Sequence, residues 1–143
     1  MSDLTEKTAL ELVRAVATDA TTVEAIASAY LDRIATREPD VRAWAYLDPD
    51  KVLQEARALD QGPRRGLLHG APFAAKDIID TVDMPTGHGS LIYEGRQPDR
   101  DATCIALCRA AGGLLLGKTV TTEFAHVSPG PTRNPHDPTR TPG

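Results

Sequence analysis

Lys76 is the residue whose type and setting point most directly to chemistry. It lies in FAAKDIID (73–80), where apolar residues on both sides predict a short buried strand. A lysine is rarely fully buried unless it is paired or has a chemical role. Its ammonium can reach solvent, pair with a carboxylate, or lose a proton and act as a base. Asp77 is a poor partner, since neighbouring side chains of a strand point to opposite faces. Spacing alone leaves these roles open, and reaching solvent is the default.

A second lysine, Lys118, completes an apparent phosphate-binding motif. GGLLLGKT (112–119) matches the P-loop pattern G-x-x-x-x-G-K-[ST] letter for letter. A P-loop follows a strand and opens a helix, whereas here a helix is predicted before the match. Three leucines would also lie where backbone N–H groups must face phosphate. We therefore predict a helix end, a buried strand and Lys118 at the strand's end, in place of a nucleotide site.

Other reactive residue types form weaker patterns. Ser90 lies near His88 in GHGS, which is a faint indication of a nucleophile with a base but is more typical of turn residues. The spacing of the four histidines (His69, His88, His126 and His136) does not indicate a metal site.

Two cysteines lie four residues apart, at Cys104 and Cys108. That spacing resembles a metal-binding pair, but no nearby residue completes a zinc-like set of four. Leu107 and Ala111 share their helix face, so we predict that this face packs in the core.

The elements that must position Lys76 alternate between helices and strands, which predicts an α/β fold. Four helices are predicted: at 7–18, from a Thr21–Glu24 capping box to Pro39, from Asp48–Pro49 to about Leu59, and from Asp101 to about Ala111. Strands are predicted at 43–47, within 67–80 and at 114–116. A short helical turn is predicted within 121–126. We expect an N-terminal helical segment, residues 1–62, followed by a core of strands and helices, residues 63–143.

The last 17 residues, VSPGPTRNPHDPTRTPG, contain five prolines and two glycines, which exclude a helix or a central strand. Such a tail can be disordered, but its repeated turn formers are also typical of an ordered loop that leads into another element.

Composition excludes several classes of protein. The 143 residues have 41% hydrophobic and 25% charged content, as in globular proteins. A net charge of −4 without a Lys/Arg cluster argues against nucleic-acid and anionic-membrane partners. There is no run of 18 apolar residues and the start does not resemble a signal peptide, so we expect a cytoplasmic location.

Four blocks of the sequence, taken in order, resemble the amidase signature enzymes. They are GLLHGAPFAAKDIID, MPTGHGS, DATCIALCRAAGGLLLGKTVTTEFAH and PGPTRNPHDPTRTPG. Each block is common alone, but their order and spacing are specific. The resemblance covers about residues 66–143, and the helical start fits the family's less distinctive N-terminal region. It implies an amidase-signature-like mixed sheet flanked by helices, with the fold incomplete in this chain.

The resemblance also implies a Ser–cis-Ser–Lys triad in which Lys76 is the base. In the family's mechanism the neutral lysine takes a proton through a bridging serine, and a second serine attacks the amide carbonyl. Water then hydrolyses the acyl-enzyme, while backbone N–H groups stabilise the oxyanion. Desolvation by Phe73 and Ile78 would favour the neutral lysine that this role requires. The implied partner is a small-molecule amide; no cofactor or metal is implied, and a homo-oligomer stays open.

Both serines of the family lie beyond the Thr-Pro-Gly block with which this sequence ends. We therefore expect the chain to correspond to about the first third of such an enzyme and to be inactive alone. Two alternatives remain: the amide-hydrolysing subunit of a glutamine-dependent amidotransferase, which implies partner subunits, and a truncated, non-catalytic binding or structural module.

Overall fold

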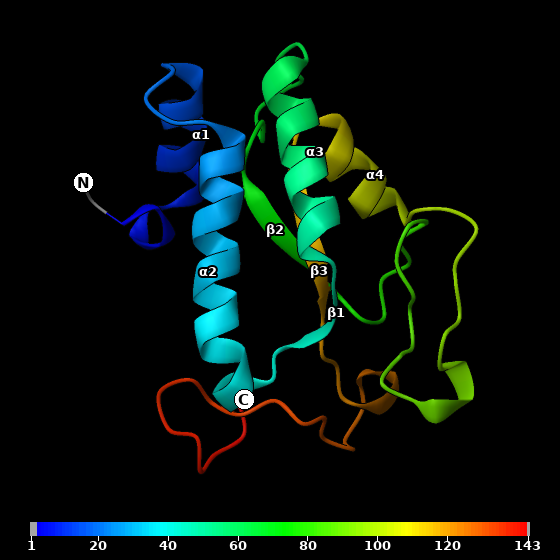
Figure 1. Ribbon diagram of the computed structural model, residues 1–143. Coiled ribbons are helices and arrows are strands. Elements are labelled where there is room, and N and C mark those ends of the chain that lie inside the picture. The colour runs from blue at the N-terminus through cyan, green and yellow to red at the C-terminus, as the bar shows by residue number, and fades with distance from the viewer. Residues whose placement is uncertain (1–2, 143) are drawn as a thin grey trace. The chain divides into compact units, whose positions relative to one another are not determined.

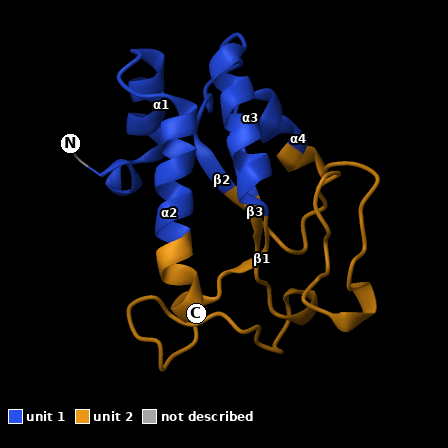
Figure 2. Ribbon diagram, in the orientation of Figure 1, with its two compact units in different colours: residues 1–34, 48–73, 106–116 blue, residues 35–47, 74–105, 117–143 orange. Residues whose placement is uncertain are grey.

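The computed structural model describes residues 3–142, which divide into two compact units (Figure 2). Unit 1 comprises 3–34, 48–73 and 106–116 of the described residues. Unit 2 comprises 35–47, 74–105 and 117–142 of them.

Helix α1 (Ala9–Ala17) begins with a reciprocal cap within unit 1. The Thr8 hydroxyl accepts a hydrogen bond from the Glu11 amide, and the Glu11 carboxylate accepts one from the Thr8 amide at 2.8 Å. This pairing satisfies two of the amides that a helix start leaves free. Leu12 and Val16 are the buried residues of its inner face.

Helix α2 (Val23–Val41) begins on a carboxylate from far along the chain. Asp60 accepts hydrogen bonds from the amides of Val23 at 2.8 Å and Glu24 at 2.9 Å. Thr22, rather than Thr21, adds a local cap by accepting from the Ala25 amide. The predicted Thr21–Glu24 capping box is therefore wrong.

The C-terminal end of α2 also differs from the prediction. Pro39 lies inside the helix, which continues to Val41. The Glu38 carboxylate accepts from the amides of Ala43 and Trp44, both at 3.0 Å, and so joins the helix end to the next strand.

Helix α3 (Pro49–Gln61) confirms its predicted start. The Asp48 carboxylate accepts from the Lys51 amide at 3.1 Å, and Pro49 occupies the first turn, where its missing N–H costs nothing. Val52, Ala56 and Leu59 form its buried stripe.

The sheet contains β1 (Trp44–Leu47), β2 (Pro72–Lys76) and β3 (Leu114–Thr119) in the order β1-β3-β2 (Figure 1). Strands β1 and β3 are antiparallel. The Leu114 amide donates to the Ala71 carbonyl and the Asp77 amide to the Thr119 carbonyl, so β2 and β3 run parallel. This mixed sheet with flanking helices confirms the predicted α/β class.

The predicted strand in place of a P-loop is confirmed. Helix α4 (Thr103–Ala110) ends before Gly112, whose φ is +88°, and GGLLLGKT then continues into β3. Leu114, Leu115 and Leu116 are buried.

The cysteine-bearing face of α4 does not pack in the core as predicted. Cys104 is exposed and Cys108 half-buried, while Leu107 is 65% exposed. Ile105 is the buried residue of this helix.

Short 3₁₀ segments complete the described elements, at Leu4–Glu6, Leu91–Tyr93 and Glu123–Ala125. The last of these lies where a helical turn is predicted, but Phe124 and Ala125 have φ values of +50° and +57°, so the turn there is not a regular right-handed helical one. Residues 127–142 contain neither helix nor strand. They nevertheless make defined contacts within unit 2: the Arg133 amide donates to the Val41 carbonyl at 2.8 Å, and the Thr132 hydroxyl to the Arg42 carbonyl at 2.8 Å. Gly143, which closes the Thr-Pro-Gly block, lies outside the described residues.

In the described range 3–142, none of the helices combines the length and the apolar character needed to cross a bilayer.

Candidate functional site

Lys76 is the last residue of β2, and its side chain is exposed. The preceding residue, Ala75, is 1% exposed, as expected where strand neighbours point to opposite faces. The predicted burial of Lys76 is therefore wrong for residues 3–142.

Lys76 lines a cavity of about 580 Å³ within unit 2. One wall is the end of β3 and the residues that follow it, 119–122. Ala43 and several residues of the proline-rich segment, 127–142, also line it, and Thr141 and Pro142 are among them. His126 also lines this cavity, and its imidazole is a second side chain there that can donate or accept a proton.

Among residues 3–142 the buried lysine is Lys118, which has no exposed surface. Its ammonium donates to the Ile79 carbonyl at 2.8 Å, the Thr86 hydroxyl at 2.6 Å and the Pro85 carbonyl at 3.3 Å. The Asp77 carboxylate lies 3.7 Å from the Lys118 Nζ. A buried cation is tolerated when its donors and its charge are both met in this way.

Burial lowers the pKa of Lys118, and the carboxylates of Asp77 and Asp80 oppose that shift. Asp80 itself binds Arg96 through two hydrogen bonds of 2.7 and 3.1 Å. Those hydrogen bonds lower the pKa of Asp80. The acidic side chains around Lys118 therefore favour its charged form.

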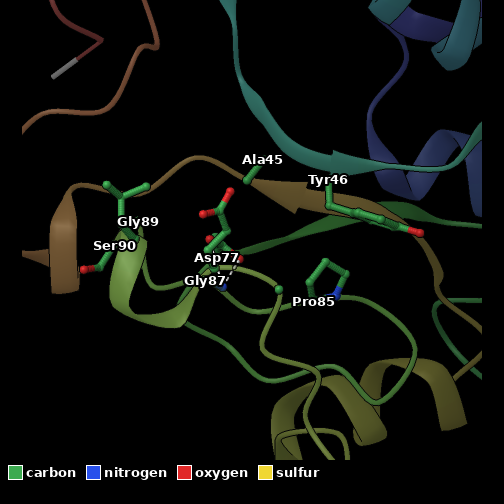
Figure 3. Close-up of a pocket in the computed structure, with 10 residues that line it drawn as sticks. Ala45, Tyr46, Asp77, Pro85, Gly87, Gly89 and Ser90 are labelled. Carbon is green, nitrogen blue, oxygen red and sulfur yellow. Dashed lines mark hydrogen bonds between the residues drawn. The ribbon is translucent and has the colours of Figure 1, made fainter.

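Asp77 lines a second cavity, of about 300 Å³, together with Tyr46, Pro85, Gly87 and Ser90 among others (Figure 3). Figure 3 shows the Asp77 side chain in the middle of this group of residues. The Gly87 amide donates to both Asp77 carboxylate oxygens, at 3.1 and 3.2 Å.

Ser90 is not arranged as a nucleophile with His88. Its hydroxyl donates to the Glu123 carboxylate at 2.7 Å. The His88 ring instead packs against Tyr93 and Phe124, with ring centroids 5.0 and 6.4 Å away. Both residues serve to join the 88–93 loop to the 123–125 turn.

No group of three or more His, Cys, Asp or Glu side chains is placed to hold a metal ion within the described part of the chain.

Residues 25–143 match the family model described as Amidase. This chain belongs to the amidase family. Its membership confirms the resemblance that the four sequence blocks indicate.

Relatives of this amidase-family chain include amidotransferase subunits and a putative amidase. A glutamyl-tRNA(Gln) amidotransferase subunit from Acidothermus cellulolyticus is 46% identical over 100% of this chain and 30% of its own length. A putative amidase, AmiD, of Mycobacterium bovis is 39% identical over 76% of this chain and 25% of its own length. The amidase-family chain thus spans about a third or less of these relatives.

A solved structure with the same local fold is that of the peptide amidase PAM in complex with the competitive inhibitor chymostatin. It has a TM-score of 0.87 and 34% identity over 96% of this chain and 31% of that one.

The Lys118 network of this amidase-family chain is not predicted from the sequence. The spacing places Lys118 only at a strand end, and no local pattern marks its acceptors, which lie 32 to 39 residues away in the sequence. One signal was available: a lysine two residues after a run of buried leucines requires partners.

Proposed function

We propose that Lys76 is the general base of a site that hydrolyses the C–N bond of carboxamides. One observation carries the proposal: Lys76 and the segment Thr141–Pro142 line the same cavity. In the amidase signature enzymes that this chain resembles, the bridging serine follows the Thr-Pro-Gly block. A serine delivered from this end of the segment would enter the cavity beside Lys76.

The proposed proton path runs from the nucleophilic serine through the bridging serine to the neutral Lys76 amine. The nucleophile's oxygen attacks the amide carbonyl, and the amine leaves with a proton returned by the same path. Water then cleaves the ester and restores the free serine. Neither serine of this path is assigned to a residue of this chain.

Water exclusion is a further requirement of the proposal. Lys76 is exposed among the described residues, so the part of the relatives that this chain does not span would cover the cavity. The cover would provide the desolvation that a neutral lysine needs.

We propose for the domain organisation the same division as the sequence indicates, a helical segment at 1–62 and the start of the catalytic core at 63–143.

A second candidate within this chemistry is the amide-hydrolysing subunit of an amidotransferase. It is favoured by the 46% identity to the Acidothermus amidotransferase protein over the whole chain. In that case the substrate is glutamine and partner subunits are required.

A cytoplasmic location and a homo-oligomer remain predictions, as does the absence of nucleic-acid and membrane partners.

The test is a chimera that joins residues 1–143 to the remaining sequence of the Acidothermus relative, assayed with and without that relative's partner subunits for ammonia release from glutamine and from simple primary amides. Lys76→Met should lower kcat about 100- to 10,000-fold, the range that general-base catalysis contributes. Lys7→Met makes the same chemical change outside the cavity and should leave kcat unchanged. Full activity of the Lys76→Met chimera would refute the proposed base.

The 143-residue chain alone should release no ammonia, because a base without its nucleophile does not catalyse this reaction. If the chain alone proves stable, monodisperse and cooperative in melting, and the chimera is inactive even with the relative's partner subunits present, the non-catalytic module becomes the better account.

A further inference from the structure

We propose that Lys118 is a positioning residue for Lys76: it fixes the turn that follows β2 and thereby the strand end from which Lys76 projects. The inference rests on the proposed function of Lys76, but its structural part can be tested without any catalysis. All of the residues concerned lie in unit 2.

Lys118 connects the two ends of the turn that follows β2, residues 77–86, by hydrogen bonds. An ammonium has three N–H donors. One reaches the Ile79 carbonyl, at the start of the turn, and the other two reach Pro85 and Thr86 at its far end. Since Thr86 is fully buried and Lys118 has no exposed surface, water cannot replace these hydrogen bonds.

The turn is connected to Lys76 through the adjacent residue, Asp77. Asp77 is 7% exposed, and four groups hold it. Its carboxylate lies 3.7 Å from the Lys118 Nζ and accepts from the Gly87 amide. Its own amide donates to the Thr119 carbonyl, and its carbonyl accepts from the His88 amide, both at 2.9 Å. These two hydrogen bonds hold the peptide planes before and after Asp77. Since the plane before Asp77 includes the Cα of Lys76, that Cα has little freedom to move.

This network lies away from the proposed base. Asp77 lines the cavity of about 300 Å³, whereas Lys76 lines the cavity of about 580 Å³. Lys118 and Asp77 therefore hold the strand end without competing for the lone pair of Lys76. A base needs such support from residues outside its own cavity if it is to keep a fixed distance to its proton donor.

Lys118→Met is the decisive variant, because methionine fills a similar volume but donates no hydrogen bond. Amide hydrogen exchange is measured on the 143-residue chain. Exchange at Asp77, Gly87 and His88 should rise at least about tenfold, the effect of losing a buried hydrogen bond. The Val52 amide, which donates to the Asp48 carbonyl in α3, should change less than about threefold.

Two control variants make the exchange data decisive. Lys7→Met makes the same chemical change outside the network and should leave exchange at Asp77 and Gly87 unchanged. Thr86→Val removes one acceptor but keeps the ammonium, so it should raise exchange at the same amides by less, and it decides the question if Lys118→Met does not fold. An equal rise at Val52, or no rise in the turn, would overturn the proposal.

The functional part is tested in the chimera with the Acidothermus relative. Lys118→Met should lower kcat at least about tenfold while KM changes less than about threefold, since an interaction that orients the base acts in the transition state. An unchanged kcat would overturn the positioning role. If Lys76→Met retains full activity, the proposed function fails instead, and the exchange data still decide whether Lys118 fixes the turn.

Discussion

The start of α2 offers a sharp test of how this chain is stabilised, because Asp60 lies outside the helix that it caps. Asp60→Ala removes the acceptor of the Val23 and Glu24 amides. Val23 has no exposed surface, so its unpaired amide should cost about 1–3 kcal/mol. The Glu24 amide can be hydrated at a smaller cost, comparable to the low end of an N-cap loss, about 0.5 kcal/mol. We expect the free energy of unfolding to fall by about 2 kcal/mol, which corresponds to roughly 6–8 °C in Tm.

Urea unfolding followed by circular dichroism measures this change. Asp60→Asn keeps one acceptor oxygen and should lose about half as much. Asp40→Ala removes an exposed carboxylate in the last turn of the same helix and should change stability by less than about 0.5 kcal/mol. A loss below about 0.5 kcal/mol for Asp60→Ala, or an equal loss for Asp40→Ala, would refute the assignment of Asp60 as the cap.

Two further substitutions test other parts of the fold. Gly117→Ala would place a methyl group against the backbone carbonyl oxygen of Tyr46 in the neighbouring strand, and should cost at least about 2 kcal/mol in urea unfolding; a neutral result would contradict the close approach of β1 and β3. Burial lowers the pKa of His69 below its ordinary value of 6.5, with nearby arginines adding to the shift. The unfolded chain therefore binds the proton more readily, and stability should fall as the pH drops below about 6.5. His69→Gln should flatten this part of the stability profile; an unchanged slope would exclude His69 as its source.

Local signals predict the elements that local interactions determine. The Asp48–Pro49 pair starts α3, and the leucines of 114–116 form a strand, because both depend on adjacent residues. The predicted cap of α2 is wrong because the real acceptor is 37 residues away from Val23. Nothing near residue 23 distinguishes a helix capped by a distant carboxylate from one capped by its own threonine.

The two lysines illustrate the same limit at the candidate site. The apolar run around Lys76 predicts burial, but a strand's last residue is buried only if something covers it. Lys118 is buried because the turn after β2 folds over it and supplies three acceptors. The order of the sequence blocks nevertheless indicates the amidase family, since that signal needs no three-dimensional information.

The contacts of the proline-rich segment have a consequence for how the chain folds. The Thr132 hydroxyl bonds a carbonyl 90 residues earlier, and the Arg37 guanidinium reaches the Pro135 carbonyl across 98 residues. Closing loops of this length costs entropy before the contact contributes anything, and high contact order slows folding. We expect these hydrogen bonds to form after the helices and to open first. The part of the cavity lining that this segment supplies would then be the last part of unit 2 to become ordered and the first to be cut in limited proteolysis.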